Sequence, residues 1–195
     1  MILKYLFDRI FAAFSLIILS PFFLIIFILH KVKMPEGKFI FRQTRIGMNG
    51  KPFRIFKIRT MKENSEEGGS VSVYDDERIL PFGKWLRETK VDTFFELINI
   101  LIGDMSFVGP RPDVPGYADK LEGDDRKILT VRPGITGPAS LKYRHEDRIL
   151  AQQPDPKRYN DEVIYPDKVK INLQYLENWS FFSDVKILWK TFFGK

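Results

Sequence analysis

The sequence predicts an α/β fold, mostly helical with a small antiparallel ribbon, in a monotopic membrane protein whose N-terminal helix is re-entrant and broken at a Ser-Pro pair. Residues 10–29 are apolar apart from two serines and a proline, which indicates a membrane segment. Two alternating segments flank Asn49-Gly50, a strong hairpin signal, and apolar residues recur at helical spacing in residues 91–103. These observations separate a membrane segment from a mixed, largely helical domain.

The composition narrows the classes of function. The 195 residues suffice for one domain plus an appended segment. The chain has no cysteine and only two histidines, so a disulfide framework and a thiolate nucleophile are excluded, and a histidine-based triad or zinc site nearly so. The net charge of +6 suits anionic lipids, nucleotides or nucleic acid. Phenylalanine gathers at the chain ends rather than among basic strand residues, which argues against nucleic acid.

The membrane segment is predicted to bend in its middle. Pro21 removes a backbone donor and clashes with the carbonyl of Ile17, and Ser20 is placed to satisfy a freed backbone group. Each half is about ten residues, or about 15 Å of helix, enough to reach the middle of a bilayer and return. Basic residues flank both ends, namely Lys4, Arg9, Lys31, Lys33 and Lys38. Both ends therefore prefer the cytosolic side, which favours a re-entrant hairpin; a kinked single span is the alternative.

The ribbon is expected from Lys38–Gln43 and Pro52–Thr60, where apolar and polar residues alternate. The polar positions of the second segment are cationic, namely Arg54, Lys57 and Arg59. They form either a binding face or a solvated sheet face. The polar stretch Lys62–Asp76 predicts a mobile loop of the kind that serves as a lid or binding loop. A helix over Glu77–Glu88 follows, with Arg87 near its end.

Two acids and one arginine stand out in the middle of the chain. Asp92 and Glu96 fall four residues apart on one face of the expected helix, and Gly103 can cap its end. The Gly109–Pro112 turn cannot be helical, and it holds Arg111 on a stiff loop that suits bidentate capture of a phosphate or carboxylate. An acid near a fixed arginine suggests chemistry on a phosphorylated substrate.

The last part of the chain predicts a helix over Tyr117–Leu129 with a break at Gly123, and a rigid Pro/Gly turn over Val131–Gly137 that carries Arg132. Another helix is expected from Pro166 to Leu176, followed by a short apolar helix within residues 179–193. Trp and Lys at the borders of this last helix suit a position in the lipid headgroup layer. Packing on the core is the alternative.

Taken together, these residues resemble one family, the small monotopic polyprenyl-phosphate phosphoglycosyl transferases, bacterial sugar transferases that begin glycan assembly on a lipid carrier. The likeness covers nearly the whole chain and rests on Ser20-Pro21, Phe41–Gly47, Phe53–Met61, Asp92, Gly103–Pro112, Val131–Gly137 and Asn178–Ser180. The resemblance implies a re-entrant membrane helix-hairpin over residues 1–36. It also implies a cytosolic catalytic domain with interfacial amphipathic helices over residues 37–195.

The resemblance further implies transfer of a sugar phosphate from a UDP-sugar to undecaprenyl phosphate, with release of UMP, at the cytoplasmic face of the bacterial inner membrane. Asp92 matches the nucleophile of the family and would share Mg²⁺ with the diphosphate. Arg87 and Arg111 would lie on phosphate oxygens. The remaining candidates for substrate binding are Lys57, Arg59, Pro110, Arg132 and Asn172. A structural ion pair is the alternative for each arginine.

The chain departs from the family pattern at two acids. Thr93 stands where the family usually has a glutamate directly after its nucleophile, and Glu96 is the candidate to supply the missing carboxylate. The alternative is a solvated or core-rim glutamate. Asn172 stands where the family has an acid, and Asp167 is either its substitute or a helix cap.

These departures keep a rival function open, that of a catalytically impaired homologue acting as a membrane scaffold for glycan assembly. Such a scaffold would recruit later glycosyltransferases. The partners implied for the active enzyme are the UDP-sugar, undecaprenyl phosphate and membrane lipids, with no nucleic acid. The sequence leaves the sugar and the oligomeric state open, and we expect the sugar to be read within residues 113–165.

Overall fold

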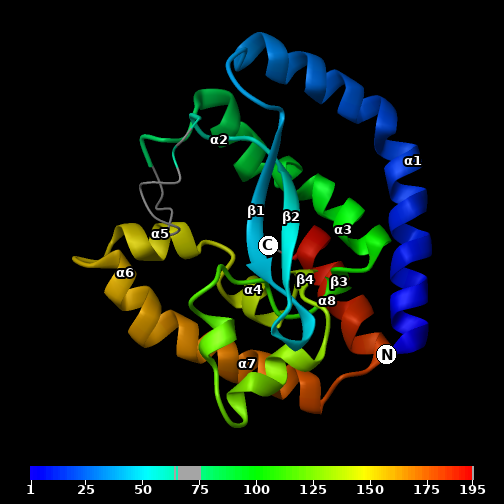
Figure 1. Cartoon of the computed structure of the whole chain (residues 1–195), viewed down its shortest axis with the longest axis vertical. Coiled ribbons are helices and arrows are strands. Elements are labelled where there is room, and N and C mark those ends of the chain that lie inside the picture. The colour runs from blue at the N-terminus through cyan, green and yellow to red at the C-terminus, as the bar shows by residue number, and fades with distance from the viewer. Residues whose placement is uncertain (64, 66–75, 195) are drawn as a thin grey trace. The chain divides into compact units, whose positions relative to one another are not determined.

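The computed structural model describes residues 1–63, 65 and 76–194, which form helices and two small sheets (Figure 1). These residues fall into two compact units. The first unit holds residues 1–43, 54–63, 65 and 76–103, and the second holds residues 44–53 and 104–194. The membrane boundary expected at residue 36 is a different division and stays a prediction. The loop expected over Lys62–Asp76 lies for the most part outside the described residues.

The first unit begins with α1, Ile2–Lys33, which contains Pro21. Figure 1 shows that α1 changes direction along its length. Because Pro21 has no N–H, the carbonyl oxygen of Ile17 lacks its helical partner, and the Ser20 hydroxyl donates to that oxygen at 2.8 Å. The predicted compensation by Ser20 is confirmed. Both halves belong to one bent helix without an intervening turn, and the choice between re-entrant and spanning topology stays a prediction.

Most large apolar side chains of α1 are exposed. Ile2, Leu3, Ile10, Ile17 and Leu24 are all more than 60% exposed. By length and composition α1 can cross a membrane. Part of α1 nevertheless belongs to a protein core, in which buried Ile26 packs with Ile58 and Leu86 and is flanked by phenylalanines. The helix therefore has exposed apolar side chains suited to lipid and other side chains that pack into the core of the first unit.

The middle of the first unit contains α2 (Pro81–Glu88), the 3₁₀ turn η3 (Val91–Phe95) and α3 (Glu96–Ile102). The helix expected over residues 91–103 is thus a 3₁₀ turn that continues as an α-helix. Gly103 ends it in the left-handed conformation (φ 97°), with its N–H donating to the carbonyls of Asn99 and Ile100. The predicted glycine cap is confirmed.

The predicted ribbon is confirmed as β1 (Ile40–Ile46) and β2 (Pro52–Ile58), which form a two-stranded sheet (Figure 1). A single 3₁₀ turn, η1 (Met48–Gly50), joins them, and such a short connection makes the strands antiparallel. Asn49 and Gly50 have positive φ of 60° and 75°, the conformation that predicted the hairpin. The chain passes from the first unit to the second within β1 and returns within β2.

The second unit contains a sheet that the sequence did not predict. The strands β3 (Ser106–Val108) and β4 (Gly134–Thr136) pair in parallel, with Ser106 opposite Gly134 and Val108 opposite Thr136. Between them lie two 3₁₀ turns, η4 (Ala118–Lys120) and η5 (Asp125–Thr130). The expected break at Gly123 is confirmed, since Gly123 lies between the two turns at φ 54°, but the flanking segments are 3₁₀ turns rather than longer helices.

The helices of the second unit follow β4. They are α4 (Pro138–Lys142), α5 (Glu146–Ala151), α6 (Pro156–Tyr159), the π-helix η6 (Asn160–Ile164), α7 (Tyr165–Glu177) and α8 (Phe181–Phe193). The last of these is amphipathic. Ile187 is buried in a cluster with Val108 and Tyr175, whereas Phe182 and Phe192 are 83% and 77% exposed. Packing of one face of this helix on the core is confirmed, and the position of its exposed face in the lipid headgroup layer stays a prediction.

Candidate active site

Asp92 is the second residue of η3 and is only 9% exposed. Its Oδ1 is buried and has no hydrogen-bond partner among the described residues. The turn is shaped by Lys90, which adopts a left-handed conformation (φ 58°), and by the Thr93 hydroxyl, which donates to the Lys90 carbonyl at 2.9 Å. A buried carboxylate oxygen without a donor is costly, and such groups are typical of sites that await a ligand.

Glu96 is the most buried acid of the segment, at 1% exposure. The Lys57 ammonium lies 3.2 Å from its Oε1, and the two side chains are 14% and 2% exposed. The expectation of a solvated or rim glutamate is therefore wrong. Glu96 can be buried because it is paired with the Lys57 ammonium, since an unpaired carboxylate is not stable in a protein interior. Glu96 and Lys57, thirty-nine residues apart in the sequence, form one buried pair.

Asn99 attaches α3 to β2. It is fully buried, its Nδ2 donates to the Arg54 carbonyl at 2.8 Å, and its Oδ1 accepts from the Phe56 N–H at 3.0 Å. The amide thus bonds to the backbone in the way a neighbouring strand would. Asn99 is not among the residues predicted from the sequence. Its only signal is a polar residue within an apolar helical stretch.

Two arginines of the first unit differ in what they bind. The Arg87 side chain, in the last turn of α2, is half-buried and donates from Nε to the Thr60 hydroxyl at 2.8 Å. Arg59 is 7% exposed and donates from Nε, Nη1 and Nη2 to backbone carbonyls. Arg59 therefore fixes the chain that follows α1, and its predicted role in substrate binding is corrected to a structural one.

The second unit holds the Pro-Arg-Pro loop, which is fastened through its backbone. The Arg45 side chain donates to the Pro112 carbonyl at 3.2 Å, and the Ile46 N–H donates to the Asp113 carbonyl at 2.9 Å. Pro110 is buried while the Arg111 side chain is exposed. The loop thus presents Arg111 from a rigid backbone, as the sequence predicts.

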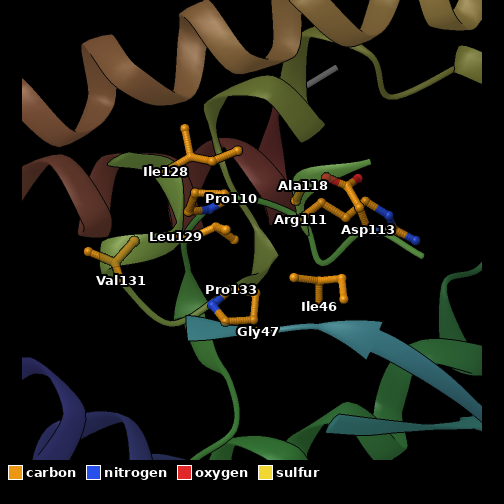
Figure 2. A pocket seen from close by; sticks show the side chains of 10 residues that line it. All are labelled: Ile46, Gly47, Pro110, Arg111, Asp113, Ala118, Ile128, Leu129, Val131 and Pro133. Carbon is orange, nitrogen blue, oxygen red and sulfur yellow. The ribbon is translucent and has the colours of Figure 1, made fainter. Parts of the chain in front are cut away.

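A pocket opens next to this loop (Figure 2). Its wall is largely apolar and includes Ile128, Leu129 and Val131, and its charged lining residues are Arg111 and Asp113. Figure 2 shows these two side chains near each other on one side of the pocket, and the positive charge of Arg111 acts on the Asp113 carboxyl. The pocket is small, and its charged groups lie together on a mostly apolar wall.

Asp113 is a candidate that the sequence analysis missed. Burial raises the pKa of Asp113 to about 6, against the opposing charges of Lys168, Arg45 and Arg111. A shifted carboxyl in a pocket is a recognised mark of functional sites. The available signal was its place directly after the Pro-Arg-Pro motif.

The remaining candidates also lie in the second unit. Arg132 is half-buried and precedes Pro133 of the pocket wall. Asn172 lies in α7 at 5% exposure, and its Oδ1 is buried without a hydrogen-bond partner in the described part of the chain. Asp167 accepts from the Lys142 ammonium and the Tyr143 hydroxyl, both at 2.7 Å. It makes no cap, so the cap interpretation of Asp167 is wrong; these hydrogen bonds hold its pKa below the ordinary range.

The carboxylates of the first unit offer a limited donor set for Mg²⁺. Within residues 1–63, 65 and 76–194, no three His, Cys, Asp or Glu side chains gather as a metal site. Mg²⁺ commonly binds through one or two carboxylates together with substrate phosphates, so such a cluster is not required. The orphaned Oδ1 of Asp92 fits this mode. Oε1 of Glu96 also makes no hydrogen bond within the described residues, but it lies 3.2 Å from the Lys57 ammonium in an ion pair.

The comparisons with known proteins define the class. A family model described as bacterial sugar transferase matches residues 1–194. The chain belongs to this family, a class of transferase enzymes, and the resemblance drawn from its motifs is confirmed at that level.

Individual relatives agree. The chain is 34% identical over 189 residues to the sugar transferase EpsL of Bacillus subtilis, covering 96% of this chain and 84% of EpsL. It is 34% identical to the UDP-glucose:undecaprenyl-phosphate glucose-1-phosphate transferase of Escherichia coli, covering 95% of this chain but only 38% of that protein. An Aeromonas hydrophila UDP-N-acetylgalactosamine-undecaprenyl-phosphate N-acetylgalactosaminephosphotransferase is 33% identical, with 94% and 41% covered. The chain therefore spans well under half of the latter two relatives.

Proposed function

We propose that this protein transfers a sugar phosphate from a UDP-sugar to undecaprenyl phosphate and releases UMP, as the first membrane step of a bacterial glycan pathway. The observation that carries the proposal is the Asp92 carboxylate, buried with an orphaned oxygen on a fixed turn. Two relatives whose names state this reaction, with glucose and N-acetylgalactosamine, support it. Whichever sugar is used, the reacting group is the same diphosphate.

Two displacements account for the transfer. An oxygen of Asp92 attacks the β-phosphorus, the bond from that phosphorus to the bridging oxygen breaks, and its electron pair leaves on UMP. An oxygen of the lipid phosphate then attacks the same phosphorus, and the Asp92 carboxylate is regained. Splitting one displacement between two anionic substrates into two steps lets each acceptor be positioned separately. Neither step requires a proton from the protein, which is consistent with Thr93 in place of a second acid.

Cations offset the repulsion between the nucleophile and the diphosphate. Arg111 is exposed on a rigid loop, so it is suited to meet the phosphates of a soluble nucleotide. Arg87 and Lys57 carry charge within the unit that holds Asp92, and Arg132 and Pro110 flank the pocket of the other unit. Preorganised cations of this kind stabilise the charge that develops in phosphoryl transfer.

Asp92 would also hold the Mg²⁺ of the family, through the oxygen that has no protein donor. When bound, the ion would neutralise phosphate charge as a Lewis acid. The chain itself contributes the fixed carboxylate and the exclusion of water around it.

The lipid substrate requires the site to face a membrane. We place the protein at the cytoplasmic face of the bacterial inner membrane, held by α1 as a re-entrant segment and by the exposed aromatic face of α8. Lysines in α8 would meet anionic headgroups while Phe182, Trp189 and Phe192 enter the acyl boundary. Labelling a cysteine introduced at position 2 from outside intact cells would contradict the re-entrant topology.

The test is UMP release by the detergent-solubilised protein with a panel of UDP-sugars, Mg²⁺ and undecaprenyl phosphate. We expect release with at least one sugar and its loss, by about 10³-fold or more, in Asp92→Asn. Glu177→Gln, at an exposed acid at the end of α7, is the control and should keep full activity. Equal activity of Asp92→Asn and the parent protein would refute the nucleophile.

A scaffold for later glycosyltransferases is the second candidate. Two observations favour it, namely Thr93 and the buried Asn172, which stand where the family has acids. Glycan production in cells distinguishes the two functions, because a scaffold would survive Asp92→Asn and an enzyme would not.

A further inference from the structure

Glu96 and Lys57 form an acid–base pair of the first unit in which both side chains are less than 15% exposed, and Glu96 follows the proposed nucleophile by four residues. We propose that Glu96 is a positioning residue of the transfer reaction. It holds the Lys57 ammonium at the diphosphate bound by Asp92, and Asn99 fixes the strand and helix that carry these side chains. This inference rests on the proposed function and adds a role for Glu96 other than that of a second acid.

The pair constrains the lysine strongly. Glu96 is almost fully enclosed, and its Oε1, which makes no hydrogen bond within the described residues, lies 3.2 Å from the Lys57 ammonium as its ion-pair partner. If Lys57 swung out to solvent, it would leave an uncompensated buried carboxylate, which is strongly unfavourable. Lysine ordinarily has a flexible four-carbon stem and many rotamers. Pairing with Glu96 therefore converts a flexible cation into a fixed one, and the lysine is the member of the pair that a ligand can reach.

The backbone on both sides of the pair is fixed by Asn99. This residue lies one helical turn after Glu96, and its amide binds the backbone of Arg54 and Phe56 at 2.8 and 3.0 Å. Phe56 directly precedes Lys57 in β2. The two hydrogen bonds lock the register between α3 and β2, and so the distance between the chain positions of Glu96 and Lys57.

Asp92 belongs to the same rigid segment. It precedes Glu96 by four residues in a continuous 3₁₀ and α-helical run. That spacing corresponds to about 6–8 Å of helical rise. A diphosphate in contact with Asp92 is long enough to approach a cation placed near Glu96. In this arrangement Asp92 attacks the β-phosphorus, Lys57 stabilises the charge that develops on the diphosphate, and Glu96 orients Lys57.

The experiment compares Glu96→Gln, Lys57→Gln and the double variant that carries both changes. The readouts are the single-turnover rate of sugar-phosphate adduct formation from a UDP-sugar, the KM for that sugar, and the melting temperature. We expect Glu96→Gln to slow adduct formation about tenfold or more, with little change in KM, because the lysine is no longer held. Glu177→Gln, at an exposed glutamate at the end of α7, is the control and should retain the rate.

The double variant keeps the inference testable if a single change unfolds the protein. Two glutamines can hydrogen-bond without charge, so the double variant should recover the melting temperature. The inference predicts that it stays slow, since the placed cation is gone. A double variant that recovers the wild-type rate together with the fold would show that the pair is only structural and would overturn the inference.

Adduct formation by the wild-type protein separates the role of Glu96 from the transfer reaction itself. A wild-type protein that forms no adduct with any UDP-sugar overturns the proposed function and this inference with it. A wild-type protein that forms the adduct at the same rate as folded Glu96→Gln overturns the inference alone. A conservative Lys57→Arg variant that retains much of the rate, when Lys57→Gln does not, supports the role of a held cation.

Discussion

The two units of the protein fix their candidate site residues by opposite means. In the first unit, Asp92 belongs to a helical segment tied down by buried side chains, through Glu96 on Lys57 and Asn99 on the β2 backbone. In the second, Arg111 is exposed on a loop that is held through its backbone. A desolvated nucleophile thus requires side-chain contacts around it, whereas a cation that binds a soluble phosphate needs only a rigid backbone beneath it.

The largest effect is expected at Gly134, in the second unit, where backbone contacts hold the loop. A Cβ at this position would lie 2.2 Å from the backbone nitrogen of Gly109, in the turn before the Pro-Arg-Pro loop. We expect Gly134→Ala to destabilise the protein by about 3 kcal/mol or more, because backbone atoms cannot move aside as a flexible side chain would. Denaturant unfolding in detergent measures the change.

Gly116→Ala is the control for Gly134→Ala. Gly116 has φ +103°, but a Cβ added there would meet no atom within 4 Å, so the cost of the substitution comes from backbone strain alone, about 1 kcal/mol. Equal losses at the two glycines would refute the close-packing argument.

The next largest effect is expected at Asn99, one of the buried side chains that hold the helical segment of the first unit. Asn99→Ala leaves the Arg54 carbonyl and the Phe56 N–H without their buried partner, and we expect a loss of about 2–3 kcal/mol in the free energy of unfolding. Asn178→Ala removes one exposed bond to the Gln174 carbonyl and should cost less than about 1 kcal/mol. A smaller loss in the free energy of unfolding for Asn99→Ala than for Asn178→Ala would contradict the role of the Asn99 hydrogen bonds.

Arg111 tests the exposed cation directly. We expect Arg111→Ala to lower kcat/KM for the UDP-sugar about 100-fold, because one charged donor to the phosphates is lost. The melting temperature should stay the same, since the side chain is exposed and the loop is held by its backbone. Arg111→Lys should restore part of the activity, as it keeps the charge but not the bidentate geometry. A change in stability without a change in kcat/KM would assign Arg111 to the fold.

Asp113 gives the smallest and most pH-dependent effect. Its pKa rises from an ordinary 3.8 to about 6 on folding, so the folded state binds the proton more tightly than the unfolded state. Its contribution is most favourable below pH about 4 and is lost as the pH rises through about 6, a change on the order of 1–3 kcal/mol. The melting temperatures of the wild type and Asp113→Asn, measured as a function of pH, should diverge over this range. Parallel curves would refute the burial of the carboxyl.

Local chemistry was predictable from the sequence. The compensation of Pro21 by the Ser20 hydroxyl, the Asn49-Gly50 hairpin and the Gly103 cap each depend on residues within a few positions of one another. The stiffness of the Pro-Arg-Pro loop follows in the same way from the restricted backbone of proline. The position of Asp92 in a helical segment also depended only on local periodicity.

Distant pairing explains what the sequence did not predict. The strands β3 and β4 have three residues each and pair across a gap of more than twenty residues, which leaves no periodicity to detect. Arg59 had the pattern of a strand cation, but its partners are carbonyls before and after the ribbon. The enclosure of Glu96 by Lys57 and the desolvation of Asp113 likewise depend on tertiary packing.

The central claim is that Asp92 covalently accepts the sugar phosphate. Intact mass spectrometry after brief exposure of the protein to a UDP-sugar and Mg²⁺, without lipid phosphate, tests it most directly. We predict a mass increase equal to one sugar phosphate, located by peptide mapping to the fragment bearing Asp92, and its loss on addition of undecaprenyl phosphate. Release of UMP to the lipid with no adduct on this fragment, or with the adduct on another residue, would contradict the account.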